Sequence, residues 1–278
     1  MVQSTTGSPL KEVSMAIRVV VTGACGKMGQ EVVRSIMMQD DIELVGAIDT
    51  GRGTGADIGH ISGIEEVGVV VSQDLSAVLE KERPDCIVDF TKGHVAPDNI
   101  MCALSHHVAA IVGTTGISDD AVNIIRKRSD ETDTPVLIAP NFALGAVLLM
   151  KFSTIASQYF RHAEIIELHH DRKADAPSGT AIRTADLMTV NRQFISPENT
   201  DEKVAHVRGG VHRSVHIHSV RLPGLLAHQE VLFGSEGEFL TIRHDSTSRS
   251  CFMPGVMLAV RKIGAVQGLI IGLENLME

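Results

Sequence analysis

The first half of the chain alternates short apolar stretches with stretches of helical periodicity. Ile17–Thr22 is β-branched, apolar and followed at once by glycines, which indicates a buried strand. Residues 30–38 carry apolar side chains at a spacing that places them on one helix face. Further strands are predicted at residues 43–48, 67–71, 85–90, 108–112 and 136–139, with helices between them, one of which begins near Asp74 or Ser76. This alternation predicts a Rossmann-type, doubly wound α/β domain with a parallel sheet covered on both faces.

The alternation of strand-like and helix-like segments changes after about residue 141. Residues 165–169 are strand-like, residues 179–188 are helix-like, and residues 196–203 read as a polar loop. From Val204 to His244 short strands follow one another, with a turn at residues 234–237 between strands at 230–233 and 239–243. The pattern predicts a smaller α+β domain with a mostly antiparallel sheet.

The C-terminal tail returns to helical spacing. Pro254 suits a first helical position, and apolar residues recur along the tail at Val256, Val260, Ile263 and Val266. We expect this helix to pack back on the first domain. The first domain would then span residues 1–141 and be completed by residues 250–278, and residues 142–249 would form the second domain.

Composition narrows the classes of protein that the chain can belong to. At 278 residues it can bury two modest cores. A net charge of −9, no Trp and one Tyr argue against nucleic acid as a partner. No apolar run is long enough to cross a bilayer. The four cysteines show no CxxC pairing, which favours reduced thiols in a cytosolic protein. We expect residues 1–15 to be a flexible extension, or an upstream start before Met15.

A glycine-rich loop follows the first predicted strand. Gly23, Gly26 and Gly29 have a G-x-x-G-x-x-G spacing, which allows a tight turn and a close approach of the backbone to a pyrophosphate. Asp49 ends the second predicted strand, where a carboxylate would accept hydrogen bonds from the adenosine ribose. The alternative is a glycine-rich turn that binds nothing.

The choice between the two nicotinamide cofactors stays open. Asp49 favours NADH, because its charge repels the 2′-phosphate of NADPH. Arg52, or Lys27 in the glycine loop, could offset that repulsion.

Two further loops follow predicted strands, at the edge where such folds bind ligands. Their sequences are Gly113-Thr114-Thr115-Gly116 and Ala139-Pro140-Asn141-Phe142. Small residues let the backbone approach a nicotinamide ring, and Asn141 can hydrogen-bond its carboxamide. We therefore predict that both loops contribute to the cofactor site.

Residues 167–180 carry the densest cluster of chemical groups in the chain. His169 can carry a proton near neutral pH, and Lys173 can donate one or anchor an anion. Ser178 is a plausible helix N-cap, and the amides of Gly179 and Thr180 would form an anion site suited to a carboxylate. We interpret this segment as the site of substrate binding and proton delivery.

A metal site is the obvious rival, because the chain has 13 histidines. Adjacent residues on a strand point to opposite faces, so His169 and His170 would not chelate one ion together. His216 and His218 share a strand face but have no matching third ligand. We predict no metal and a structural role for the second pair.

From about Ala16 to the C-terminus, the chain resembles dihydrodipicolinate reductases, also called 4-hydroxy-tetrahydrodipicolinate reductases. The resemblance is carried by residues 23–29, 113–116, 139–142 and 167–180. The run E-x-H-H-x-x-K-x-D-x-P-S-G-T is highly specific for that family. The resemblance implies reduction of a cyclic unsaturated dicarboxylate to tetrahydrodipicolinate with NADH or NADPH, in lysine and diaminopimelate biosynthesis. It also implies that residues 1–141 and 250–278 form a dinucleotide-binding domain and that residues 142–249 form a substrate-binding and tetramerisation domain. The protein would be a homotetramer in the cytoplasm, or in the plastid stroma of a plant.

The resemblance also implies roles for individual residues. His169 would be the proton donor or acceptor and Lys173 the second proton donor, while Arg249 resembles an arginine near the site in relatives. The substrate carboxylates would be held by His170, Lys173, Ser178, Gly179 and Thr180. The cofactor would be bound by Gly23, Ala24, Cys25, Gly26, Lys27, Met28, Asp49, Gly113, Thr114, Thr115, Ala139, Pro140, Asn141 and Phe142.

One departure from the family pattern concerns the cofactor. Many members that use NADPH place an arginine directly after the ribose-binding acid, whereas Thr50 follows Asp49 here. Two other classes of protein share the glycine loop: another two-domain dehydrogenase, such as an aspartate or homoserine dehydrogenase, and a non-catalytic NAD-sensing module. The first would not need residues 169–180, and the second leaves their basic cluster without a purpose.

Overall fold

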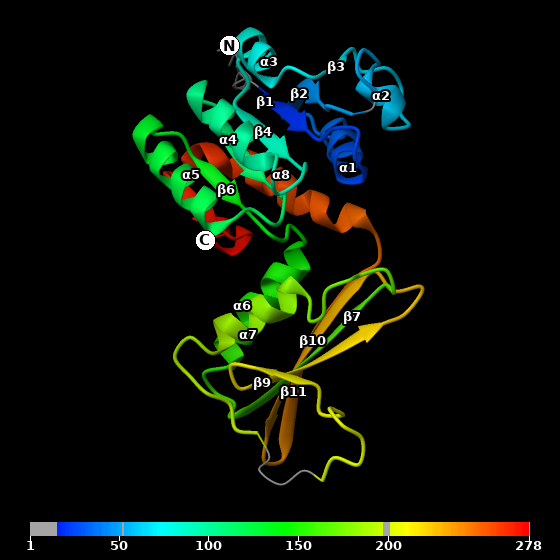
Figure 1. The fold of residues 1–278 in the computed structure, drawn as a ribbon, viewed down its shortest axis with the longest axis vertical. Helices are drawn as coiled ribbons and strands as arrows, with labels where there is room; N and C mark the ends of the chain where they lie inside the picture. The colour runs from blue at the N-terminus through cyan, green and yellow to red at the C-terminus, as the bar shows by residue number, and fades with distance from the viewer. Residues whose placement is uncertain (1–15, 52, 197–200, 278) are drawn as a thin grey trace, which may run out of the picture.

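The computed structural model of the protein describes residues 16–51, 53–196 and 201–277. The expectations for residues 1–15, for Arg52 and for residues 197–200 of the polar loop lie outside the described residues. The chain folds into two lobes joined through α6 (Leu144–Ala156) and the segment before α8 (Met253–Lys262) (Figure 1).

The first lobe is built on a parallel sheet of seven strands in the order β12-β6-β5-β4-β1-β2-β3. The strands are β1 (Ile17–Thr22), β2 (Ile42–Ile48), β3 (Val71–Ser72), β4 (Cys86–Asp89), β5 (Ala109–Val112), β6 (Val136–Ile138) and β12 (Leu269–Ile271). Strands β2 and β3 lie on one side of β1, and β4, β5, β6 and β12 lie on its other side. The chain connections therefore diverge between β1 and β4. This divergence opens a ligand crevice at the carboxyl ends of the strands, and it confirms the predicted doubly wound fold.

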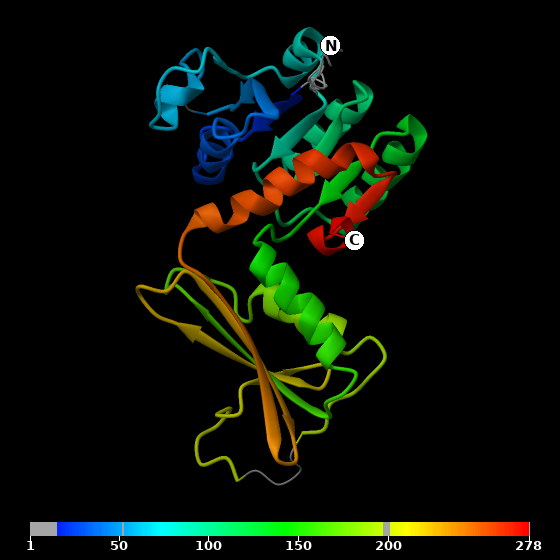
Figure 2. The ribbon, with the colours of Figure 1, turned by 180° about the vertical axis from the view of Figure 1, so that it is seen from behind.

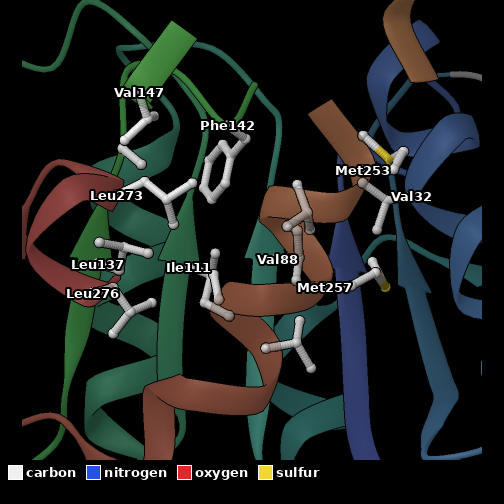
Figure 3. Close-up of a cluster of buried hydrophobic side chains, with 14 of the residues drawn as sticks. Val32, Val88, Ile111, Leu137, Phe142, Val147, Met253, Met257, Leu273 and Leu276 are labelled. Atoms are coloured by element: carbon white, nitrogen blue, oxygen red, sulfur yellow. The ribbon is translucent and has the colours of Figure 1, made fainter. Parts of the chain in front are cut away.

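Helices cover both faces of this sheet because its strands are apolar on both sides. Side chains of β1 alternate, so Val19 and Val21 pack in one core and Val20 packs in the other. One face carries α1 (Lys27–Ile36) and α8, and the opposite face carries α3 (Leu75–Glu82), α4 (Ala96–Ser105) and α5 (Asp119–Thr132). Figure 2 shows α8 crossing the sheet, and Figure 3 shows Val88 of β4 and Met257 of α8 in the core between them.

The second lobe is a five-stranded sheet with two helices on one face. Its strand order is β11-β10-β7-β9-β8, and its only parallel pair among the described residues is β7 with β9. The elements are β7 (His162–His169), α7 (Gly179–Met188), β8 (Gly210–His212), β9 (Val215–Arg221), β10 (Ala227–Ser235) and β11 (Glu238–Ser246). The predicted mostly antiparallel sheet is confirmed, as is the predicted helix at residues 179–188.

Three sequence predictions differ from the structure. The strand at residues 67–71 is reduced to β3, because the Val69 carbonyl accepts its hydrogen bond from the Ile58 amide and not from a neighbouring strand of the sheet. Helix α1 begins at Lys27 and not at residue 30, so the glycine loop runs directly into it. The tail is helical at α8, with Pro254 in its first turn as predicted, but it ends in β12, which pairs with β6.

The short α2 (Ile58–Ile61) and three 3₁₀ helices complete the described elements. They are η1 (Arg249–Phe252), η2 (Ile263–Ala265) and η3 (Leu273–Leu276). None of the described helices is long and apolar enough to cross a membrane.

Candidate active site

Residues 167–180 run from the end of β7 to the start of α7. Ser178 is the N-cap of α7, as predicted: its hydroxyl accepts a hydrogen bond from the Ala181 amide at 3.2 Å. The Ser178 amide donates back to the Glu167 carboxylate at 3.3 Å. The loop therefore folds over the end of β7 and brings the first turn of α7 beside His169.

The Glu167 carboxylate lies at the centre of this segment and is fully buried. It accepts a hydrogen bond from His169 Nδ1 at 2.5 Å and two from the Arg221 guanidinium at 2.8 and 2.9 Å. Burial opposes ionisation of this carboxyl, but the hydrogen bonds from His169 and Arg221 outweigh burial and lower its pKa to about 2. Sequence reasoning assigned Glu167 no role, although it belongs to the motif.

Lys173 lies across the loop from His169. Its ammonium donates to both carboxylate oxygens of Asp175 at 2.8 Å. Arg221 also donates to the main-chain carbonyl of Asp175, at 2.7 Å. One guanidinium on β9 therefore supports both the partner of His169 and the partner of Lys173.

A cavity of about 430 Å³ joins the two lobes at this point. The second lobe contributes His169, Lys173 and the start of α7, and the first lobe contributes the loops after β5 and β6. The residues that line it are Thr115, Pro140, Asn141, Met150, His169, Lys173, Asp175, Ser178, Gly179, Thr180 and Arg183. Predicted cofactor residues and predicted substrate residues thus face one space.

A smaller cavity of about 40 Å³ lies on another side of His169. Gln229 of β10 and His244 of β11 line it, and neither was singled out from the sequence. Gln229 is buried and donates to Thr184 at 2.7 Å, while its Oε1 has no hydrogen-bond partner among the described residues. Burial lowers the pKa of His244, which holds its ring neutral over a wider pH range.

The glycine loop has the shape that a pyrophosphate requires. A Cβ on Gly29 would lie 2.2 Å from the carbonyl oxygen of Gly23, so only glycine lets α1 approach the loop this closely. Asp49, at the end of β2, accepts a hydrogen bond from the Cys25 amide at 3.1 Å. The first-turn amides of α1, beginning at Lys27, lack intrahelical acceptors and form an anion site. These residues fit a dinucleotide.

Behind the loops, a buried carboxylate at the end of β4 is hydrogen-bonded to β1, to α4 and to the loop after β5. Asp89, at the end of β4, accepts hydrogen bonds from Thr22 and Thr114 at 2.7 Å and from Asn99 at 2.8 Å. The ring of the next residue, Phe90, would lie 2.1 Å from a Cβ on Gly113. Sequence reasoning placed residues 85–90 in a strand without seeing that its end braces the cofactor loops.

The cavity is not lined by Thr114, Phe142, His170 or Arg249, which were predicted to contact the cofactor or the substrate. The Thr114 hydroxyl is engaged by Asp89 and the Phe142 ring is buried in the core, so either residue would reach a cofactor through its backbone. His170 does not line the cavity, and its buried Nδ1 has no hydrogen-bond partner in the part of the chain that the structure describes. Arg249 is exposed at the start of η1 and is not a lining residue.

The predicted structural histidines bond to nearby groups in their own lobe. His216 bonds to the Arg208 carbonyl, and His218 bonds to the Glu164 carboxylate at 2.8 Å. In the part of the chain that the structure describes, no group of three or more His, Cys, Asp or Glu side chains could hold a metal ion.

The first lobe has a glycine loop beside the crevice between β1 and β4, and the second lobe presents a histidine and a lysine to the cavity that joins the two lobes. This arrangement is that of the two-domain, nicotinamide-dependent oxidoreductases. Family models narrow the class further. The model of the dihydrodipicolinate reductase N-terminus matches residues 17–142, and that of the C-terminus matches residues 145–277. The chain belongs to the dihydrodipicolinate reductase family, as its sequence motifs predicted.

Individual relatives agree along nearly the whole chain. The 4-hydroxy-tetrahydrodipicolinate reductase of Moorella thermoacetica is 48% identical over 264 residues, which cover 94% of this chain and 98% of the relative. The enzyme of the same name from Desulfitobacterium hafniense is 49% identical over 265 residues, covering 94% and 99%. A dipicolinate-bound dihydrodipicolinate reductase from Paenisporosarcina sp. TG-14 is 39% identical, with a TM-score of 0.83 and coverage of 94% and 99%.

Proposed function

We propose that this chain is a 4-hydroxy-tetrahydrodipicolinate reductase, which reduces dihydrodipicolinate to tetrahydrodipicolinate with NADH or NADPH in lysine and diaminopimelate biosynthesis. The observation that carries the proposal is the 430 Å³ cavity, because it sets His169 and Lys173 opposite the loops after β5 and β6. A dehydrogenase without this chemistry would not need the buried Glu167–Arg221 pair behind the histidine.

The cavity has the groups that a small dicarboxylate requires. The first-turn amides of α7 at Gly179 and Thr180 offer one carboxylate a partially positive helix terminus. Lys173 and Arg183 add fixed positive charge on the lining. The solved relative that is named as dipicolinate-bound supports a planar dicarboxylate as the ligand class.

In the proposed reaction, the bound cofactor supplies a hydride from C4 of its nicotinamide. The substrate would take that hydride at one end of a double bond, leaving the cofactor oxidised, and would need a proton from this chain at the other end. His169 and Lys173 both line the cavity and can deliver the proton. The glycine loop and Asp49 would bind the pyrophosphate and the ribose, and Asn141 would orient the carboxamide.

The predicted domain division assigns these tasks to separate parts of the chain. Residues 1–141 with 250–278 would carry the cofactor, and residues 142–249 would carry the substrate. Closing the cleft between the two lobes would then complete the cavity and exclude water.

A coupled assay tests the function. Pyruvate, aspartate semialdehyde and the condensing synthase generate the substrate in situ, and nicotinamide absorbance is followed after this protein is added. The proposal predicts rapid oxidation of the cofactor that depends on the synthase. Oxidation with aspartate semialdehyde or homoserine in the absence of the synthase would favour another dehydrogenase, and no oxidation at all would favour a sensing module.

We also propose a homotetramer that assembles through the second lobe. Strand β11 is the edge of its sheet, with Phe239 80% exposed and Leu240 partly exposed. A long edge strand with exposed apolar side chains is a surface that proteins normally cover. Four free cysteines fit a cytoplasmic location, where thiols stay reduced.

A further inference from the structure

We propose that Glu167, held by Arg221, is a positioning residue for His169: it fixes the ring with a proton on Nδ1 and leaves Nε2 to the cavity. The inference rests on the proposed function, because it assigns His169 to proton delivery. It adds two residues, Glu167 and Arg221, that do not line either cavity and act through the histidine.

The hydrogen bond to Glu167 determines which nitrogen of the His169 ring carries the proton. A carboxylate can only accept hydrogen bonds, and Glu167 Oε2 lies 2.5 Å from Nδ1, so Nδ1 must carry the proton. The other ring nitrogen is then free to exchange a proton in the cavity that His169 lines. Since Glu167 is fully buried and held by Arg221 and the Ser178 amide as well, its carboxylate cannot swing away from the histidine.

The charges explain why an arginine accompanies the acid. An unpaired buried carboxylate would be costly, and the Arg221 guanidinium offsets its charge through two hydrogen bonds. The same guanidinium donates to the Asp175 carbonyl, and the Asp175 side chain holds Lys173. Arg221 therefore couples the supports of both candidate proton donors.

Other titratable groups also face the space around His169. Lys173 and Asp175 of the loop line the larger cavity, and His228 and His244 of β10 and β11 line the smaller one. His228 is engaged by Asp245 at 2.7 Å, and burial lowers the pKa of His244. Of the five residues, Glu167 alone is a carboxylate bonded directly to the His169 ring.

The same strand offers a matched control. Glu164 is also on β7 and also pairs with an arginine and a histidine, Arg208 and His218. It does not line either cavity. Glu164→Gln removes a comparable charge from a comparable pair and should leave turnover unchanged.

The kinetic test is a double-mutant cycle between Glu167→Gln and His169→Gln in the full-length enzyme. Alone, Glu167→Gln should lower kcat about tenfold or more while the Kd for NADH stays within about twofold. Added to His169→Gln, it should lower kcat by less than about twofold, because the residue through which it acts is already gone. Equal losses in both backgrounds would overturn the inference and leave Glu167 a structural residue.

A spectroscopic test does not depend on turnover. Imidazole ¹⁵N signals of His169, assigned by their loss in His169→Gln, should show the Nδ1–H form at high pH in the wild type. They should change in Glu167→Gln and not in Glu164→Gln. An unchanged tautomer in Glu167→Gln would refute the inference even if the enzyme reduces the proposed substrate, whereas a failed coupled assay would refute only the proposed function. If Glu167→Gln does not fold, Glu167→Gln/Arg221→Gln removes both charges and replaces it in the ¹⁵N measurement, which reads the His169 ring alone and not the Arg221 contact with Asp175.

Discussion

Replacing Gly29 by alanine tests whether the glycine loop is built for a bound pyrophosphate. The new Cβ would lie 2.2 Å from the Gly23 carbonyl oxygen and 2.7 Å from the Cα of Ala24. Both are backbone atoms, so no side-chain rotation relieves the overlap, and the loop and α1 must move apart. Overpacking of this kind costs about 1–3 kcal/mol, which corresponds to a Tm lower by roughly 2–10 °C in a chain of this size.

The same displacement should weaken cofactor binding, because the first-turn amides of α1 leave the pyrophosphate position. We expect the Kd for NADH, measured by fluorescence titration, to rise at least about tenfold. The control is Gly264→Ala in η2, where a Cβ meets nothing within 4 Å, so Tm and Kd should stay at their wild-type values. A Gly29→Ala protein with wild-type Tm and Kd would refute the close approach on which the cofactor site rests.

Three further predictions concern charge, acid stability and assembly. Asp49→Ala should weaken NADH more than NADPH in titrations of both, because the carboxylate binds a ribose and repels a 2′-phosphate; equal losses would undo the ribose assignment. Glu167, with its pKa lowered to about 2, stabilises the fold above about pH 4.5, and about 3 kcal/mol should be lost as the pH falls from there through 2. Urea unfolding should show this loss in the wild type and not in Glu167→Gln. Phe239→Glu should dissociate the tetramer in light scattering, while the control Ile124→Glu on exposed α5 should not.

The first lobe could be predicted closely because its signals are local. Buried parallel strands are continuous β-branched runs, and β1 was predicted with its observed bounds, Ile17–Thr22. The predictions failed at the two edge strands, β12 and β3, because these strands are too short to carry such a local signal. Strand β12 has three residues, too few to show a period of two against the helical spacing before it. Strand β3 has two residues, and the Val69 carbonyl just before it accepts its hydrogen bond from the Ile58 amide.

The site could be predicted where chemistry and sequence neighbourhood coincide. His169, Lys173 and the Ser178 cap lie within one short segment, and the structure brings them to one cavity. The support of that segment could not be predicted in this way. Arg221 reaches Glu167 across 54 residues, through the parallel pairing of β7 with β9, and no local pattern encodes that pairing.

The Asp89 network illustrates the same limit on the cofactor side. Its donors come from β1, from α4 and from the loop after β5, and only the assembled sheet brings them to one carboxylate. The acid at the strand end was visible in the sequence. Its use as a brace for the loops was not.

The most direct test of the account is the turnover of His169→Gln and Lys173→Ala, measured with substrate made in situ and with NADH affinity determined on the same preparations. We expect each variant to lose at least about a hundredfold in kcat while its Kd for NADH stays near the wild-type value. His218→Gln, a partly buried histidine of the same sheet outside both cavities, should keep full turnover. Full activity in both the His169 and Lys173 variants would contradict the account and remove residues 167–180 from the chemistry.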